Sequence, residues 1–291
     1  MSPSIKGIAF MCLGVLCLAL GDAISKWLGA VHSPIQIIFF RTLVSLPLIM
    51  LFARFAGGLR LLGTRRPGVH LVRGLIYAGC MGCFILGLTM MPLAEGTAIA
   101  FAAPLFVSLL SVPLLGEKVT LPVLGASLLG FIGVLVVVRP GSDGISLGAL
   151  AMLGAAVFYA LMMITARRYG GREHLWAMVF YMNLVPFIIA ALCLPLVWTT
   201  PEPWHWPGFL VSGIFGVGAT ACITQAFRYA PAAIAAPFDY TAMVWAVLLG
   251  WIFWGEVPDI WVLLGGTLII GSGLLIAYQE GRTSLKRRPT A

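Results

Sequence analysis

The sequence predicts an all-α integral membrane protein, with ten transmembrane helices arranged as two inverted five-helix repeats around a central cavity. Three observations lead to this fold class. Of the 291 residues, 60% are hydrophobic and 10% are charged, whereas ordinary soluble domains carry about 25% charged residues. The mean hydropathy is +1.02. The apolar residues form a series of segments, and the second half of the series resembles the first.

Each apolar segment is long enough to cross the hydrocarbon core of a bilayer, which needs about 20 residues of helix. We expect the spans at 5–25, 33–53, 71–90, 95–115, 121–138, 147–166, 175–197, 208–227, 232–254 and 260–279. The longest connection, 54–70, is basic and rich in glycine, which favours a position on the membrane surface. The first segment ends in polar residues without a small-residue cleavage motif, so we expect a retained helix and not a signal peptide.

Several motifs recur at a spacing of about 140 residues, which indicates an internal duplication. The motif Met91-Pro92-Leu93-Ala94 up to Gly116-Glu117 is echoed by Ala230-Pro231-Ala232-Ala233 up to Gly255-Glu256. An odd number of crossings in each repeat places the second copy upside down in the membrane, and such inverted repeats build a cavity that can open to either side. We therefore expect a first repeat at 1–140, a second at 147–280 and a basic tail at 281–291.

The cationic residues predict the orientation of the chain. Of the 18 Lys and Arg residues, all except Lys26, Arg139 and the membrane-embedded Arg41 fall on the side that holds both termini. The positive-inside rule places that side in the cytoplasm, and the protein in the inner (plasma) membrane as a multi-pass protein. The net charge of +8 then faces an anionic leaflet, and Lys286-Arg287-Arg288 is predicted to bind the membrane surface, so no nucleic-acid partner is expected.

Other motifs that could indicate cofactor chemistry fit structural roles better. Cys80 and Cys83 have C-x-x-C spacing, but no histidine lies near them in the sequence. The Gly216-x-Gly218 pair resembles part of a dinucleotide fingerprint, yet it lies inside an apolar span, where small residues let helices approach closely. The four histidines (His32, His70, His174 and His205) lie near span ends on both sides. We therefore expect no cofactor, no metal and no catalytic residues, and the lack of a Walker motif argues against an ATP-driven pump.

Six motifs stand in a characteristic order along nearly the whole chain. They are Asp22-Ala23-Ile24-Ser25-Lys26-Trp27, Phe39-Phe40-Arg41, Pro92-Leu93-Ala94-Glu95-Gly96-Thr97-Ala98, Leu114-Leu115-Gly116-Glu117-Lys118, Gly130-Phe131-Ile132-Gly133-Val134 up to Arg139-Pro140-Gly141, and Gly255-Glu256. In this order the sequence resembles the ten-helix EamA-type family of the drug/metabolite transporter superfamily. The resemblance implies a basket of ten helices around a central cavity and the export of small metabolites such as amino acids, with YddG-type amino-acid exporters as the nearest branch. The motifs do not specify a substrate.

Charged side chains inside the spans are candidates for substrate binding, because each costs about 3 kcal/mol near the bilayer centre and should face the interior. Asp239 follows Pro237 in a segment with broken backbone hydrogen bonding, and it could meet a substrate ammonium or a proton, or form a structural ion pair. Arg41 could attract a carboxylate or pair structurally. Asp22 and Lys26 lie four residues apart on one helix, so we expect them to pair with each other.

Aromatic and amide side chains would complete a cavity suited to neutral amphipathic solutes, although each ring could also face lipid or pack in the core. The predicted substrate-binding residues are Arg41, Tyr77, Phe84, Phe101, Tyr159, Tyr181, Asn183, Asp239, Tyr240 and Trp245, with Thr224 and Gln225 as further polar candidates.

The sequence therefore predicts a secondary transporter that exports small organic metabolites, neutral or aromatic amino acids first, by alternating access. The coupling ion is either a proton or absent. A carrier of the same fold that takes up or exchanges other metabolites is the alternative, and a membrane-embedded enzyme is the weakest one.

Overall fold

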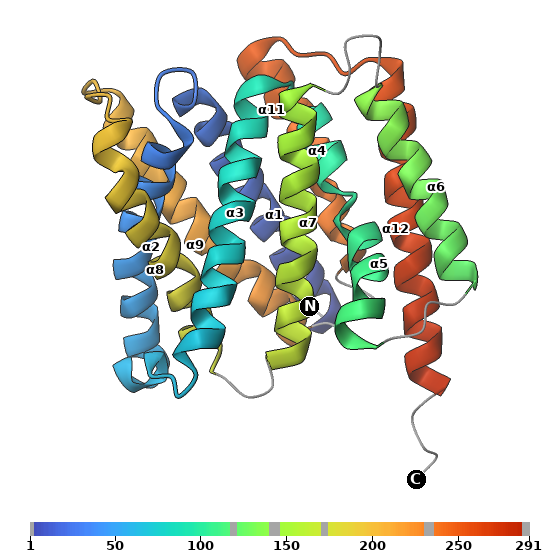
Figure 1. Cartoon of the computed structure of the whole chain (residues 1–291), viewed down its shortest axis with the longest axis horizontal. Coiled ribbons are helices and arrows are strands. Elements are labelled where there is room, and N and C mark those ends of the chain that lie inside the picture. The colour runs from blue at the N-terminus through green and yellow to red at the C-terminus, as the bar shows by residue number, and fades with distance from the viewer. Residues whose placement is uncertain (1–2, 117–120, 140–145, 170–173, 230–235, 287–291) are drawn as a thin grey trace.

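The computed structural model describes residues 3–116, 121–139, 146–169, 174–229 and 236–286. Within these residues the chain forms helices and no strand, as predicted. The helices stand side by side as one bundle (Figure 1). Their bounds are α1 (Pro3–Leu28), α2 (Pro34–Ala56), α3 (Pro67–Met90), α4 (Leu93–Ala100), α5 (Ala103–Leu115), α6 (Leu121–Val138), α7 (Leu147–Tyr169), α8 (Leu175–Cys193), α9 (His205–Tyr229), α11 (Thr241–Trp254) and α12 (Ile260–Lys286).

Short 3-10 turns accompany the bundle, including η1 (Leu59–Leu62) in the connection 54–70 and η4 (Ala236–Tyr240) before α11. Seven helical segments in the described part of the chain are long and apolar enough to cross a membrane, one of them being α4 and α5 taken together (Leu93–Leu115). Three shorter apolar helices lie at Leu124–Val138, Phe238–Trp254 and Ile260–Leu275. The chain is therefore a multi-pass membrane protein. Glu117 and the segment 230–235, which belong to the duplicated motifs, and the tail residues 287–291 lie outside the described residues.

Two of the expected spans are interrupted by proline. The span expected at 95–115 is divided into α4 and α5, because Pro104 lacks an N–H and its ring would clash with the carbonyl of Ala100 in a continuous helix. The described part of the span expected at 232–254 starts with η4, which contains Pro237, and α11 follows it. Phe101 and Tyr240 stand at the two breaks, and their ring centroids lie 5.1 Å apart. The two interrupted segments therefore meet at their breaks.

The most extensive contacts between helices match between the two halves of the chain. Helix α1 packs on α9, and α3 packs on α7. Helix α3 packs on α8, and α2 packs on α9; α5 packs on α7, and α1 packs on α11. Helix α6 packs on α12, and α2 packs on α8. The helices α1, α2, α3, α5 and α6 correspond, in this order, to α7, α8, α9, α11 and α12. If each helix is replaced by its counterpart, the same list of contacts results.

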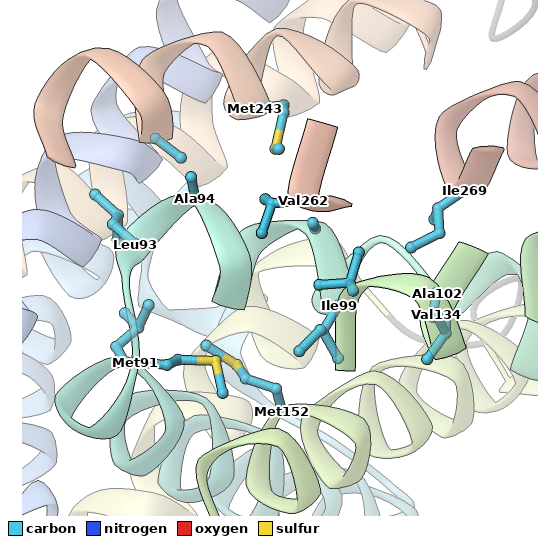
Figure 2. Close-up of a cluster of buried hydrophobic side chains, with 14 of the residues drawn as sticks. Met91, Leu93, Ala94, Ile99, Ala102, Val134, Met152, Met243, Val262 and Ile269 are labelled. Carbon is cyan, nitrogen blue, oxygen red and sulfur yellow. The ribbon is translucent and has the colours of Figure 1, made fainter. Parts of the chain in front are cut away.

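The largest core cluster lies where α4, α6, α7, α11 and α12 meet. Figure 2 shows Met243 and Val262, from the second half of the chain, next to Ala94 and Ile99 of α4. Met152 of α7 lies on the other side of α4 in the same view. This cluster joins the two halves through apolar packing alone.

Glycines set the distance between α6 and α12. A Cβ atom built on Gly133 would lie 2.8 Å from the carbonyl oxygen of Gly265, and one on Gly265 would lie 2.6 Å from the carbonyl oxygen of Gly133. Helices α1 and α9 also meet at a glycine, since a Cβ on Gly14 would lie 2.8 Å from Cγ1 of Ile223. These positions support the interpretation of the glycines as helix-packing residues.

Gly133→Ala is expected to lower the free energy of unfolding by about 1–3 kcal/mol, because the new methyl group would push α6 away from α12. The measurement is the melting temperature of the purified protein in detergent. Gly125→Ala on the same helix is the matched control, since a Cβ there meets no atom within 4 Å. Alanine has the higher helix propensity, so this control should melt at the same temperature or slightly higher. Equal losses in both variants would show that the glycine contact is unimportant.

Candidate functional site

A cavity of about 450 Å³ lies between α2, α3, α8 and α9. Its lining on α2 extends from Arg41 to Ala56, which is about 22 Å at a rise of 1.5 Å per residue. The outer end of the lining includes Phe55 and Ala56 at the end of α2 and Trp176 at the start of α8. The end of α2 lies at the lower side of the bundle in Figure 1. The cavity therefore leads from the interior toward this lower side.

Arg41 brings a positive charge to the inner end of the cavity. The residue is 9% exposed, and its Nη1 lies 3.9 Å from Oδ1 of Asp22 on α1. This separation is longer than a hydrogen bond, so Asp22 balances the charge without a close N–H contact. A Cβ on Gly216 of α9 would lie 3.3 Å from Nε of Arg41, so the missing side chain makes room for the guanidinium. Arg41 is thus paired with Asp22 and also lines the cavity.

Aromatic rings and a few polar groups surround the rest of the space. The rings are those of Phe52, Phe55, Tyr77 and Trp176, and the uncharged polar residues are Ser45, Asn183, Thr220 and Gln225. Asn183 Nδ2 donates to the carbonyl oxygen of Val179 at 2.9 Å, and Ser45 Oγ donates to that of Arg41 at 2.8 Å. An apolar cavity with one cationic group at its inner end can hold an amphipathic molecule that carries a carboxylate.

Bulky apolar side chains close the space between Arg41 and the upper side of the bundle. Ile37, Phe40 and Phe209 are buried in one cluster together with Leu28. The ring centroids of Phe40 and Phe209 lie 4.5 Å apart. Helices α1, α2 and α9 are therefore in contact on this side, where the connections from α1 to α2 and from α8 to α9 are found (Figure 1).

A buried polar network lies above this cluster. His32 Nδ1 lies 2.8 Å from Oγ1 of Thr199, and His32 Nε2 lies 3.1 Å from Nδ1 of His205. Gln36 Nε2 donates to the carbonyl oxygen of Thr199 at 2.7 Å. No pattern in the sequence predicts that two histidines meet, but the end of α1 packs beside the start of α9. Within the described ranges, no group of three His, Cys, Asp or Glu side chains is placed to hold a metal ion.

The protein is expected to lose stability as the pH falls from about 7 to about 5. Burial lowers the pKa of His32 below its ordinary value of 6.5, and His205 lowers this pKa further, against the opposing hydrogen bond with Gln36. The unfolded chain then binds the proton more readily than the native protein. This contribution to stability is complete above pH 6.5 and is lost below it. Melting temperatures measured across this range should fall less in His32→Gln than in the parent, whereas His174→Gln should behave like the parent.

The expected pair between Asp22 and Lys26 is wrong. Lys26 Nζ instead forms an ion pair with Oε1 of Glu256, which follows α11, and it also donates to the carbonyl oxygen of Met91 at 3.0 Å. Residues four apart share a helix face, but the buried guanidinium of Arg41 draws Asp22 toward α2. The long stem of Lys26 carries its ammonium past the end of α1 to the second half of the chain.

The other predicted site residues divide into two groups. Arg41, Tyr77 and Asn183 line the cavity, together with the further candidate Gln225. The remaining ones lie elsewhere. Phe84, Phe101 and Trp245 pack against the largest core cluster, and the ring of Tyr240 contacts that of Phe101. The ring centroid of Tyr181 lies 4.8 Å from that of His70. Tyr159 is 42% exposed, and Asp239 is half-buried in η4. The side chain of Thr224 lies outside the described part of the chain.

Sequence reasoning missed Ser45, Phe52, Phe55 and Trp176. A usable signal was present on α2, where Arg41, Ser45, Phe52 and Phe55 recur at the spacing of one helix face. Extending the face that carries the buried arginine would have identified Ser45, Phe52 and Phe55, but not Trp176 on α8.

The profile of the EamA-like transporter family matches residues 5–139 and 146–278. The chain belongs to the EamA-like transporter family. The proteins similar to it are named as transporters as well, so the protein is not an enzyme.

Three relatives cover almost the whole chain and differ in the substrate for which they are named. The S-adenosylmethionine uptake transporter of Rickettsia conorii is 29% identical over 95% of this chain and 94% of its own length. The pseudopaline exporter CntI of Pseudomonas aeruginosa is 31% identical over 91% and 93%. The riboflavin transporter of Rhizobium johnstonii is 28% identical over 98% and 95%. These names replace the YddG-type assignment that the sequence suggested.

A solved structure titled "Crystal structure of protein" has the same fold. It superimposes with a TM-score of 0.63 at 22% identity, covering 97% of this chain and 98% of that one.

Proposed function

We propose that this protein is a secondary transporter that carries small amphipathic metabolites with an amino-acid group, amino acids among them, by alternating access. The observation that carries the proposal is the cavity of about 450 Å³ with Arg41 at its inner end. This volume falls in the range of about 300–1,000 Å³ that is usual for sites of small ligands. The guanidinium suits a carboxylate, and Tyr77 and Trp176 offer rings for the remainder of the molecule.

We infer that the chain crosses the membrane ten times as two inverted repeats, 1–140 and 147–280. The three shorter apolar helices, added to the seven long ones, support ten crossings. The matching helix contacts and the two corresponding breaks support the duplication. The cavity is lined by α2 and α3 from one half and by α8 and α9 from the other, which are equivalent helices. A rocking of one half on the other would close one mouth while the other opens.

The orientation that we propose places the lower side of Figure 1 and both termini in the cytoplasm. Arg54, Arg60 and Arg168 lie at or next to helix ends on this side, whereas Lys26 and Arg139 lie at the opposite one. This asymmetry supports the positive-inside orientation. In this orientation the cavity leads to the cytoplasm, which corresponds to an inward-facing state of the transport cycle.

Export of the substrate is the favoured direction, and uptake is a second candidate because of the named relatives. The pseudopaline exporter supports export, while the S-adenosylmethionine transporters are named for uptake. S-adenosylmethionine carries a carboxylate, which suits Arg41, and an aromatic base, which suits the rings of the cavity.

Reconstitution in liposomes without ATP tests the proposal. We expect counterflow of at least one radiolabelled compound from a panel of aromatic amino acids, neutral amino acids, S-adenosylmethionine and riboflavin. Right-side-out and inside-out membrane vesicles then give the direction. Movement of riboflavin but of no compound with an amino-acid group would contradict the substrate class. Movement of none of them would contradict the proposed function.

Asp239→Asn is expected to flatten the pH dependence of transport while expression stays normal, because a carboxyl group inside the membrane is suited to carry the coupling proton. Asp239 lies in η4 beside the break of the second interrupted span, and within the described residues no ion pair or hydrogen bond of its side chain is found. Initial rates measured between about pH 5.5 and pH 8 provide the test. Asp259→Asn on the upper side is the control. An unchanged pH profile in the Asp239 variant would assign this residue a structural role.

A further inference from the structure

An ion pair on the upper side of the bundle joins the two halves of the chain. Lys26 at the end of α1 pairs with Glu256, which follows α11. Both side chains are also bound by backbone groups where α3 ends and α4 begins. Lys26 Nζ donates to the carbonyl oxygen of Met91 at 3.0 Å, and Glu256 Oε2 accepts from the N–H of Leu93 at 2.9 Å. One pair of charges thus connects three segments that are distant in sequence.

The surroundings of this pair distinguish it from an ordinary surface ion pair. The side chains of Lys26 and Glu256 are 9% and 21% exposed, and Nζ of Lys26 lies 5.0 Å from the centroid of the Trp254 ring. Arg139 and Asp259 form a second ion pair on the same side, but their side chains are 46% and 43% exposed. Solvent screens such an exposed pair strongly. Lys26 and Glu256 are therefore the pair whose loss should affect the packing of the helices.

The turn after α11 aims Glu256 at Lys26. Gly255 adopts a left-handed conformation with φ of 65° and ends the helix, and the N–H of Glu256 returns to the carbonyl oxygen of Gly250 at 3.1 Å. This backbone conformation favours glycine, which explains the Gly-Glu order of the motif. The duplicated motif thereby acquires a physical role in the second half of the chain.

We propose that Lys26 and Glu256, held by the backbone of Met91 and Leu93, form a latch that keeps the upper mouth closed while the cavity is open below. The inference rests on the proposed alternating access. When the upper mouth opens, α1 and the end of α11 separate and both charges enter water. Hydration then compensates for much of the lost contact, so the latch can open and close repeatedly.

The test measures access to the cavity from each side and needs no known substrate. The six native cysteines are replaced by alanine, and Thr220, which lines the cavity on α9 and is exposed, is replaced by cysteine as the reporter. A membrane-impermeant maleimide is added to sealed vesicles of either orientation. In the parent we expect fast labelling from the lower side and slow labelling from the upper side.

Lys26→Met and Glu256→Gln should each raise the rate of labelling from the upper side about tenfold or more and lower the rate from the lower side. Arg139→Gln, which breaks the exposed ion pair on the same side, should leave both rates unchanged. If a neutral variant does not give monodisperse protein, Glu256→Asp replaces it, since the shorter side chain keeps the charge, and a smaller rise is expected. As a second measurement, spin labels at Val31 and Val257 should move apart in the latch variants.

Labelling rates and label distances that stay at parent values in every latch variant would overturn the latch. So would an equal change in Arg139→Gln. Transport by the parent protein is measured separately in liposomes. Failure of all panel compounds to move, together with raised upper-side labelling in the variants, would overturn the proposed function and leave the latch supported.

Discussion

Arg41→Gln is expected to lower kcat/KM for transport about 100-fold, because the substrate carboxylate would lose the charged group at the inner end of the cavity. Arg41→Lys should recover part of this loss, since lysine keeps the charge but lacks the planar fork that binds both carboxylate oxygens. Initial rates of counterflow in liposomes, measured over a range of substrate concentrations, give both constants.

Arg168→Gln provides the control for charge removal. Arg168 is an exposed arginine at the end of α7, and its Nη1 donates to the carbonyl oxygen of Leu114 at 3.3 Å. Transport by this variant should equal that of the parent. Normal kinetics in Arg41→Gln would place the substrate carboxylate elsewhere and remove the main support for the proposed substrate class.

Asp22→Asn is expected to lower the free energy of unfolding by about 3 kcal/mol, because Arg41 would remain buried without its counter-ion. The double variant Asp22→Asn/Arg41→Gln should regain most of this stability, since neither partner then carries a charge. The measurements are melting temperatures of the purified single and double variants in detergent, arranged as a double-mutant cycle.

A double variant as unstable as the sum of the two single ones would mean that the 3.9 Å contact contributes no coupling. Asp259→Asn, which changes an exposed carboxylate on the upper side, controls for the loss of one negative charge. We expect its melting temperature to stay close to that of the parent, because asparagine can still accept the hydrogen bond from the N–H of Val262.

The two ion pairs that involve α1 have different roles in the proposed transport cycle. The pair of Asp22 and Arg41 lies inside the bundle, where it balances a charge that the substrate can contact. The pair of Lys26 and Glu256 lies at the upper mouth, where it joins segments that must separate when this side opens. Substrate binding and the closure of the mouth thus involve different charged groups on the same helix, α1.

The sequence by itself determined that the chain is helical, crosses the membrane several times and belongs to its family. In a bilayer every backbone N–H and C=O must be satisfied within its own segment, so an apolar run of about 20 residues has little choice except a helix. The packing glycines could also be interpreted locally. Gly133 and Gly265 stand at corresponding places in the two halves, and small residues are what close helix contacts require.

Only the tertiary structure decided which side chains meet. Lipid-facing and core-facing sides of these helices are both apolar, so periodicity did not distinguish Tyr77, which lines the cavity, from Phe84, which packs in the core. The pairing of Lys26 with Glu256 and of His32 with His205 depends on which helix ends lie side by side, and these partners are 230 and 173 residues apart in the sequence. Local pattern fixes a helix in the membrane, but the packing of helices fixes its neighbours.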